Sequence, residues 1–170
     1  MAKTSYAVAL GSNRRHGVYG APAAVVRAAG AALAAEPGVA LETLSTIRAT
    51  PALGPAGRSF ANAAAILSSS HDPAQMLVRL KAIERAFGRR PGRRWGPRVL
   101  DLDIVLWSHG PFAEASLTIP HPAFRARRFV LDPLAELVPG WRDPLTGLTI
   151  RQLHARLAAP RPVDPAPQHS

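Results

Sequence analysis

Two kinds of hydrophobic pattern follow one another along the chain, and together they predict four strands and two helices. Short apolar runs at 6–10, 39–46, 60–67 and 100–106 are typical of strands. Apolar residues recur with a helical period from about Pro22 to Pro37. They do so again between Asp72, which can cap a helix, and Gly88. The predicted order of elements is therefore β-α-β-β-α-β.

This order is the split βαβ arrangement of ferredoxin-like domains. It predicts an α+β fold in which both helices cover one face of an antiparallel sheet and leave the other face for ligands. The Pro- and Gly-containing segment 50–57 is expected to be a loop, and 110–157 to be loop with short helices near 129–137 and 150–157. Residues 1–158 should form one domain, followed by a Pro-rich, disordered tail at 159–170.

The last predicted strand carries two carboxylates, and an arginine-rich loop leads into it. Side chains of a strand alternate between its faces, so Asp101 and Asp103 should point one way and four apolar side chains the other: Leu100, Leu102, Ile104 and Leu106. Two carboxylates about 7 Å apart suit a pair of metal ions that arrive with a polyphosphate. The pattern indicates phosphoryl transfer; the alternative is surface ion pairing with Arg94 and Arg98.

The distribution of charge points to a compact polyanion as the ligand. The 170 residues include 21 basic and 11 acidic ones, a formal net charge of +10. Between 79 and 98, eight basic residues are opposed only by Glu84, so the excess lies at one helix end and in the loop that follows. Glycines at 88, 92 and 96 would let this loop close over a substrate and exclude water. Nucleic acid is the second candidate for the partner.

Composition excludes several other classes of site. The absence of cysteine excludes disulfides, thiolate metal sites and cysteine nucleophiles. There is no P-loop, kinase-type glycine loop, Gly-x-Ser-x-Gly or His-Glu-x-x-His motif. The sequence shows no signal-peptide pattern, and no apolar run approaches the roughly 20 residues that span a bilayer. We therefore expect a cytoplasmic protein.

Two further groups of residues could contribute to a site. His121 can donate a hydrogen bond to a phosphate and Arg127 can stabilise developing charge, although a lone histidine more often makes a structural hydrogen bond. Phe60 and Asn62 share a strand face, so they could stack on and read the edge of a flat heterocycle unless Phe60 belongs to the core. Trp95 either packs the arginine loop down when it closes or is a plain hydrophobic anchor.

Five segments carry a resemblance to a known family. The most specific is 95–105, Trp-Gly-Pro-Arg-Val-Leu-Asp-Leu-Asp-Ile-Val, and the others are 9–13, 50–54, 60–62 and 119–129. In type and order they resemble 6-hydroxymethyl-7,8-dihydropterin pyrophosphokinase, an enzyme of folate biosynthesis. The resemblance extends from about Tyr6 to Leu157, and the family's ferredoxin-like fold agrees with the predicted order of elements.

The resemblance implies transfer of pyrophosphate from ATP to the hydroxymethyl oxygen of the pterin, with release of AMP. It implies two Mg²⁺ ions bound by Asp101 and Asp103, which would be the catalytic residues together with Arg89 and Arg98. The implied ATP-binding residues are Glu84, Trp95, Arg98, Ile104, Thr118, His121 and Arg127. The implied pterin-binding residues are Thr50, Pro51, Leu53, Phe60, Asn62 and Phe129, with the two phenylalanines on either side of the ring. We expect a monomer with no nucleic-acid or membrane partner.

The chain departs from the family's pattern at several positions. Segment 55–59 and the arginine loop are each about one residue shorter than in the best-known members, which leaves Arg89 and Arg90 as alternatives for one role. Lys81 replaces a neutral polar residue on the nucleotide side, and Ser116 stands where some members have arginine. The segment after Gly-Ser-Asn is also atypical of the family, and we assign no function to its residues Arg14, Arg15 and His16.

Two rival hypotheses remain at this point. The first is an RNA-binding module, since such modules share the ferredoxin-like order and the positive charge. Against it, the strands offer only Tyr6 and Phe60 for stacking, and Asp101 and Asp103 would repel a nucleic-acid backbone. The second is an inactive homologue that binds ATP and pterin without turnover.

Overall fold

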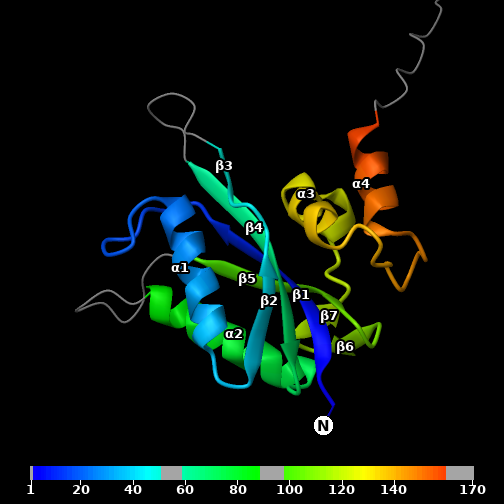
Figure 1. Ribbon diagram of the computed structural model, residues 1–170, viewed down its shortest axis with the longest axis horizontal. Coiled ribbons are helices and arrows are strands. Elements are labelled where there is room, and N and C mark those ends of the chain that lie inside the picture. Colours follow the sequence, from blue (N-terminus) through cyan, green and yellow to red (C-terminus); the bar gives the residue numbers. More distant parts are fainter. Residues whose placement is uncertain (1, 51–58, 89–97, 160–170) are drawn as a thin grey trace, which may run out of the picture.

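A computed structural model describes residues 2–50, 59–88 and 98–159 of the chain and confirms the predicted fold (Figure 1). The predicted elements are β1 (Thr4–Ser12), α1 (Pro22–Ala35), β2 (Val39–Leu44), β4 (Phe60–Ser69), α2 (Pro73–Gly88) and β5 (Asp101–Trp107). A short strand, β3 (Arg48–Thr50), precedes β4 where the sequence indicated the start of a loop. Three residues are too few to show a strand period in the sequence.

The strands form one antiparallel sheet in the order β2-β4-β1-β5, and β3 pairs with β4 beyond the end of β2. β1 and β4 are therefore central, while β5, the strand with the two aspartates, lies at an edge of the sheet. This order, with one helix after β1 and one after β4, is the ferredoxin-like arrangement.

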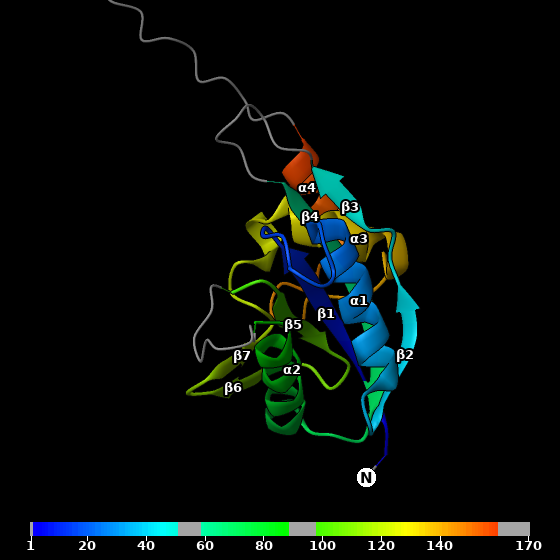
Figure 2. The same cartoon turned by 90° about the vertical axis from the view of Figure 1, so that its left-hand side faces the viewer.

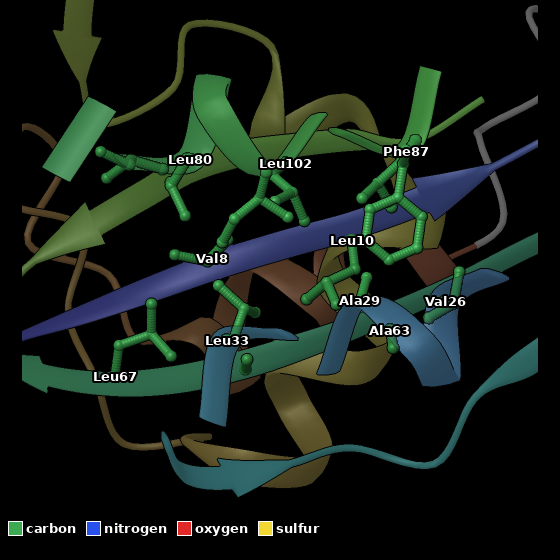
Figure 3. Close-up of a cluster of buried hydrophobic side chains, with 14 of the residues drawn as sticks. Val8, Leu10, Val26, Ala29, Leu33, Ala63, Leu67, Leu80, Phe87 and Leu102 are labelled. Atoms are coloured by element: carbon green, nitrogen blue, oxygen red, sulfur yellow. The ribbon is translucent and has the colours of Figure 1, made fainter. Parts of the chain in front are cut away.

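Helices α1 and α2 lie side by side on one face of the sheet (Figure 2). Val26, Ala29 and Leu33 of α1 and Leu80 and Phe87 of α2 are buried against the sheet. Figure 3 shows how they meet side chains from three strands, namely Val8, Leu10, Ala63, Leu67 and Leu102. Burying these apolar surfaces, at about 25 cal/mol per Å², fixes the helices to the sheet and gives the site a rigid base.

Helix α2 starts where the sequence predicts. Asp72 Oδ1 accepts a hydrogen bond from the Gln75 N–H at 2.8 Å, and Gln75 Oε1 accepts one from the Asp72 N–H at 3.0 Å. This reciprocal capping satisfies donors that the first helical turn leaves free, and Pro73 has no N–H to satisfy. The predicted cap at Asp72 is confirmed.

The opposite face of the sheet is less open than predicted. Helices α3 (Arg128–Leu137) and α4 (Ile150–Ala158) match the predicted short helices; α3 packs on this face, and α4 packs against α3 on its outer side (Figure 1). A second core joins them to the sheet through Ala7, Ala64, Ile66, Val105, Leu106, Phe124, Val130, Leu131, Leu134, Ile150 and Leu153. The connection from β5 includes a hairpin of β6 (Phe112–Glu114) and β7 (Leu117–Ile119) and a 3-10 turn, η1 (Phe124–Ala126).

The predicted alternation along β5 holds for Leu102 and Ile104 but is wrong for Leu106. The pairing of β1 with β5 shifts register between Ala7 and Val8, so that Val8 faces Ile104 while Ala7 faces Leu106. Such a β-bulge changes which side the following residues face. Leu106 therefore packs in the second core beside Val105, on the face opposite to Ile104.

Candidate functional site

A cleft of about 470 Å³ opens where α3 leaves the end of the sheet uncovered. Its walls come from β1, from the beginnings of β4 and β5, from Thr50 of β3 and from the start of α3. Seven of the residues predicted for the site line it: Thr50, Phe60, Asn62, Asp101, Asp103, Arg127 and Phe129. Residues more than 60 positions apart in the chain thus meet in one cleft.

The register of the sheet explains how Asn62 and the aspartates come together. Gly11 of β1 pairs with Asn62 on one side and with Asp101 on the other, and Ala9 pairs with Asp103. Directly paired residues of neighbouring strands point to the same face. The amide of Asn62 and the carboxylate of Asp101 therefore lie on the same face, on either side of Gly11.

Gly11 leaves the space that the Asn62 side chain occupies. A Cβ atom at position 11 would lie 3.1 Å from Asn62 Oδ1, closer than ordinary van der Waals contact. With hydrogen in that place, the amide can lie across the middle strand. The glycine thus sets the position of a polar group on the floor of the cleft.

Two exposed phenylalanines flank the cleft from different elements. Phe60 at the start of β4 and Phe129 in the first turn of α3 are 45% and 50% exposed, unlike the core phenylalanines Phe87 and Phe124. The Arg127 guanidinium carbon lies 5.7 Å from the centre of the Phe129 ring, a cation–π distance. The alternative that Phe60 belongs to the core is wrong, and both rings are partly exposed at the cleft.

Helix α3 is tied to the strand segment across the cleft by Glu136. Its Oε2 accepts a hydrogen bond from the Thr46 N–H at 2.7 Å, and its Oε1 lies 3.3 Å from Arg48 Nη2. Burial raises the pKa of Glu136, but the hydrogen bonds from Thr46 and Arg48 outweigh burial and the net pKa is lowered. The ionised carboxylate holds the helix that carries Phe129 beside the strands that carry Thr50 and Phe60.

The two aspartates provide oxygen ligands at the edge of the sheet. Asp101 is exposed and Asp103 is half-buried. Among the described residues, the cation paired with either of them is Arg98, whose Nη1 lies 3.3 Å from Asp101 Oδ1. No third His, Asp or Glu joins them within the described ranges to complete a metal cage.

Five predicted ATP-binding residues of the described ranges do not line this cleft. Ile104 is buried in the first core, and Thr118 is exposed on β7. His121 Nδ1 accepts a hydrogen bond from the Ala123 N–H at 3.2 Å, as the structural alternative for this histidine predicts. The carboxylate of Glu84 is buried between α2 and β5. Arg98 lies beside the cleft through its contact with Asp101.

The remaining predicted residues, Pro51, Leu53, Arg89 and Trp95, lie outside the described residues. The sequence interpretation also gave no role to several residues that line the cleft: Ala9, Leu10, Gly11, Ser12, Asn13 and Val130. For most of them, the sequence Gly-Ser-Asn directly after the first apolar run could have indicated that the end of this strand lies at a ligand site. Val130 carries no such signal, because its place depends on how α3 docks.

Comparisons with known proteins identify the family to which the sequence is similar. The family profile of 7,8-dihydro-6-hydroxymethylpterin-pyrophosphokinase matches residues 7–139. A 2-amino-4-hydroxy-6-hydroxymethyldihydropteridine pyrophosphokinase of Synechocystis sp. is 43% identical over 123 residues, which are 72% of this chain and 63% of that protein. The Methylorubrum extorquens protein of the same name is 37% identical over 149 residues, 87% of this chain and 90% of its own length.

Solved structures support the fold. A crystal structure of wild-type Plasmodium falciparum HPPK-DHPS superimposes with a TM-score of 0.67 at 14% identity, covering 91% of this chain and 41% of that one. This chain therefore spans less than half of the Plasmodium protein and a little under two thirds of the Synechocystis one. The profile match over most of the chain and the bacterial relatives confirm the resemblance noted in the sequence. The chain belongs to the 7,8-dihydro-6-hydroxymethylpterin-pyrophosphokinase family.

Proposed function

We propose that this chain transfers pyrophosphate from ATP to 6-hydroxymethyl-7,8-dihydropterin in folate biosynthesis, the reaction for which its relatives are named. The supporting observation is the cleft itself. It places a pair of carboxylates beside two partly exposed aromatic rings and a side-chain amide. A flat heterocycle carrying a hydroxymethyl group, together with a polyphosphate that brings cations, matches these groups in one site.

The aromatic side of the cleft is proposed to bind the pterin. Phe60 and Phe129 would stack on its two faces, since offset stacking of flat rings adds about 0.5–1.5 kcal/mol per pair beyond surface burial. Asn62 has a donor and an acceptor in one amide, which suits the alternating donors and acceptors along a pterin edge. Thr50, with Pro51 and Leu53 outside the described residues, completes the proposed set. We thus assign binding of the pterin, which accepts the pyrophosphate, to residues of β3, β4 and α3.

The acidic side of the cleft is proposed to hold Mg²⁺. Asp101 and Asp103 fit this ion because it takes oxygen ligands and is commonly bound by one or two carboxylates together with substrate phosphates. We assign two ions to them, as the family resemblance implies. When bound, the ions would neutralise phosphate charge and orient the reacting oxygens.

The chain's own contribution to the chemistry is positioning and positive charge. The pterin hydroxymethyl oxygen forms a bond to the β-phosphorus of ATP, the bond from that phosphorus to the α–β bridging oxygen breaks, and AMP leaves while the hydroxyl proton is released. Phosphoryl transfer has a loose, charge-spread transition state, so holding the two substrates in line contributes more than covalent catalysis. Arg98 and Arg127 can stabilise that charge, and Arg89 is proposed to assist.

The ATP-side assignments of Thr118, His121, Ile104 and Trp95 remain predictions, as do a monomeric state and a cytoplasmic location. No helix in the described ranges has the length and apolar character needed to cross a bilayer. The RNA-binding rival is not favoured, because the family match extends over residues 7–139 and the relatives are named for pterin pyrophosphokinase activity. Nor do the comparisons favour the inactive homologue.

The test is to mix the purified chain with ATP, Mg²⁺ and 6-hydroxymethyl-7,8-dihydropterin and to identify the nucleotide product. We expect AMP, formed only when pterin and metal are both present, and none from an Asp103→Ala control. ADP as the product would contradict pyrophosphoryl transfer. No product, with pterin still raising the melting temperature, would establish an inactive binder instead.

A further inference from the structure

Glu84 is a buried carboxylate that reaches from α2 to the strand bearing the two aspartates. Its side chain is 7% exposed. Oε1 accepts a hydrogen bond from the backbone N–H of Leu102 at 2.9 Å. Leu102 is the residue between Asp101 and Asp103, so this contact holds the main chain at the middle of the proposed metal-binding pair.

The position of β5 explains why this N–H needs an acceptor from a helix. β5 is the edge strand, and β1 pairs with it on one side only. A strand directs alternate backbone groups outward, and an edge strand leaves them without partners from the sheet. A buried N–H without an acceptor destabilises the folded state. Glu84 supplies that acceptor at Leu102 and restrains the edge strand where its geometry matters most.

Lys81 compensates the charge of this buried group. Its Nζ lies 3.3 Å and 3.2 Å from the two Glu84 oxygens, one turn earlier on α2. Without it, a third carboxylate close to Asp101 and Asp103 would add to their mutual repulsion.

We propose that Glu84 is a positioning residue for the aspartate pair, and that it acts through the Leu102 backbone with Lys81 as its counter-ion. This inference rests on the proposed function and revises the direct ATP contact that the family resemblance implied for Glu84. The carboxylate is already engaged by a backbone donor and an ammonium group, both within α2 and β5. Groups that orient metal ligands typically affect metal affinity by about 10- to 100-fold.

Two substitutions separate the hydrogen bond from the charge. Glu84→Gln keeps a side-chain oxygen that can accept from the Leu102 N–H but removes the negative charge. Glu84→Asp keeps the charge but shortens the side chain by one methylene group, which draws the oxygen away from Leu102. Glu36→Ala is the matched control, since Glu36 also pairs with a basic residue of α2, Arg79, away from β5.

The measurement is Mn²⁺ affinity by electron paramagnetic resonance with a non-hydrolysable ATP analogue present, alongside analogue affinity without metal and the melting temperature. We expect Glu84→Asp to weaken Mn²⁺ binding by about tenfold, with Glu84→Gln and Glu36→Ala close to wild type. Analogue affinity without metal should be unchanged in all three.

Three results would contradict this expectation. Wild-type Mn²⁺ affinity in Glu84→Asp would overturn the positioning role. A drop in metal-free analogue affinity for both Glu84 variants would instead show a direct nucleotide contact and also overturn it. If the wild-type chain binds neither the analogue nor Mn²⁺, the proposed function is contradicted and the positioning role falls with it. Binding by the wild type with unchanged affinity in Glu84→Asp contradicts the positioning role alone.

Discussion

Two arginine–aspartate pairs lie on the same side of the sheet, and they are built in opposite ways. Arg98 touches Asp101 through one contact of 3.3 Å, and both side chains are more than half exposed. Asp143 is completely buried, and Arg125 holds it with two hydrogen bonds, one of them 2.8 Å from Nη2 to Oδ1. Thr146 and the Leu145 N–H complete its surroundings.

The difference shows how a structural carboxylate can be told from one available for ligands. Both oxygens of Asp143 accept hydrogen bonds from protein groups. Through Arg125 they connect η1 to the segment before α4, next to the second core. Within residues 2–50, 59–88 and 98–159, Asp101 is bonded only by Arg98, through one oxygen, and its neighbour Asp103 adds a second carboxylate on the same face. Like charges on one face cost stability, and this cost is explained if cations are to be bound there.

The largest expected effect is the loss of turnover when an aspartate of the exposed pair is removed. Asp103→Ala, and equally Asp101→Ala, should lower kcat/KM by about 10³-fold or more, because several kcal/mol of transition-state charge stabilisation are lost. The free energy of unfolding without metal should change by no more than about 0.5 kcal/mol. Steady-state kinetics and urea unfolding measure the two quantities. Substantial activity in either variant would show that the metal assignment is wrong.

Removing the buried carboxylate should have the opposite profile. Asp143→Asn should lower the free energy of unfolding by about 3 kcal/mol, because the partly buried Arg125 is left without its counter-ion. At temperatures where the variant is folded, the pterin KM should stay near wild type, since Asp143 does not line the cleft. Urea unfolding measures the first and kinetics the second. If Asp143→Asn has the same free energy of unfolding as the wild type, the Arg125–Asp143 pair is not structural and does not differ in role from the Arg98–Asp101 pair.

The sequence was sufficient to predict the helices and strands with a clear hydrophobic period and the residues with functional side chains. It was not sufficient to predict contacts that depend on how these elements pack against one another. Helical and strand periods located α1, α2 and most strands, and the Asp-Leu-Asp strand identified one side of the cleft. A β-bulge turned the Leu106 side chain to the opposite face of the sheet. The bulge depends on how β5 pairs with β1, which the sequence of β5 alone does not reveal. The contact of Glu84 with Leu102 and the packing of α3 on the second face were not predictable from local pattern, because both depend on how separate elements dock.

A third prediction compares the two arginines. Arg98→Ala should lower kcat by about 10²-fold with little change in the pterin KM, because its charge is needed mainly as negative charge develops. Its side chain is 67% exposed, so stability should hardly change. Arg125→Ala is the matched control and should lower stability while the kcat of the folded protein is kept. Equal effects of the two substitutions on kcat would contradict the division of roles.

Acid should act on the buried pair. Burial raises the pKa of Asp143, but the hydrogen bonds from Arg125, Thr146 and the Leu145 N–H outweigh it and bring the pKa to about 2. Since the folded-state pKa lies below the unfolded value of about 4, this carboxylate contributes stability that is complete above about pH 4 and lost as the pH falls towards 2. Urea unfolding across this range should show a shallower loss for Asp143→Asn than for wild type. Parallel curves would mean that Asp143 is not the group responsible.

The smallest expected effect is on the floor of the cleft, and it tests whether geometry alone can weaken the site without touching stability or charge. In Gly11→Ala the new methyl group would lie 3.1 Å from Asn62 Oδ1, so the amide must move by a few tenths of an ångström. A displaced hydrogen bond to the pterin should raise its KM about fivefold, close to 1 kcal/mol, with kcat nearly unchanged. Gly140→Ala, where a Cβ has no neighbour within 4 Å, is the control. An unaltered KM in Gly11→Ala would mean that Asn62 does not read the pterin edge from its present position.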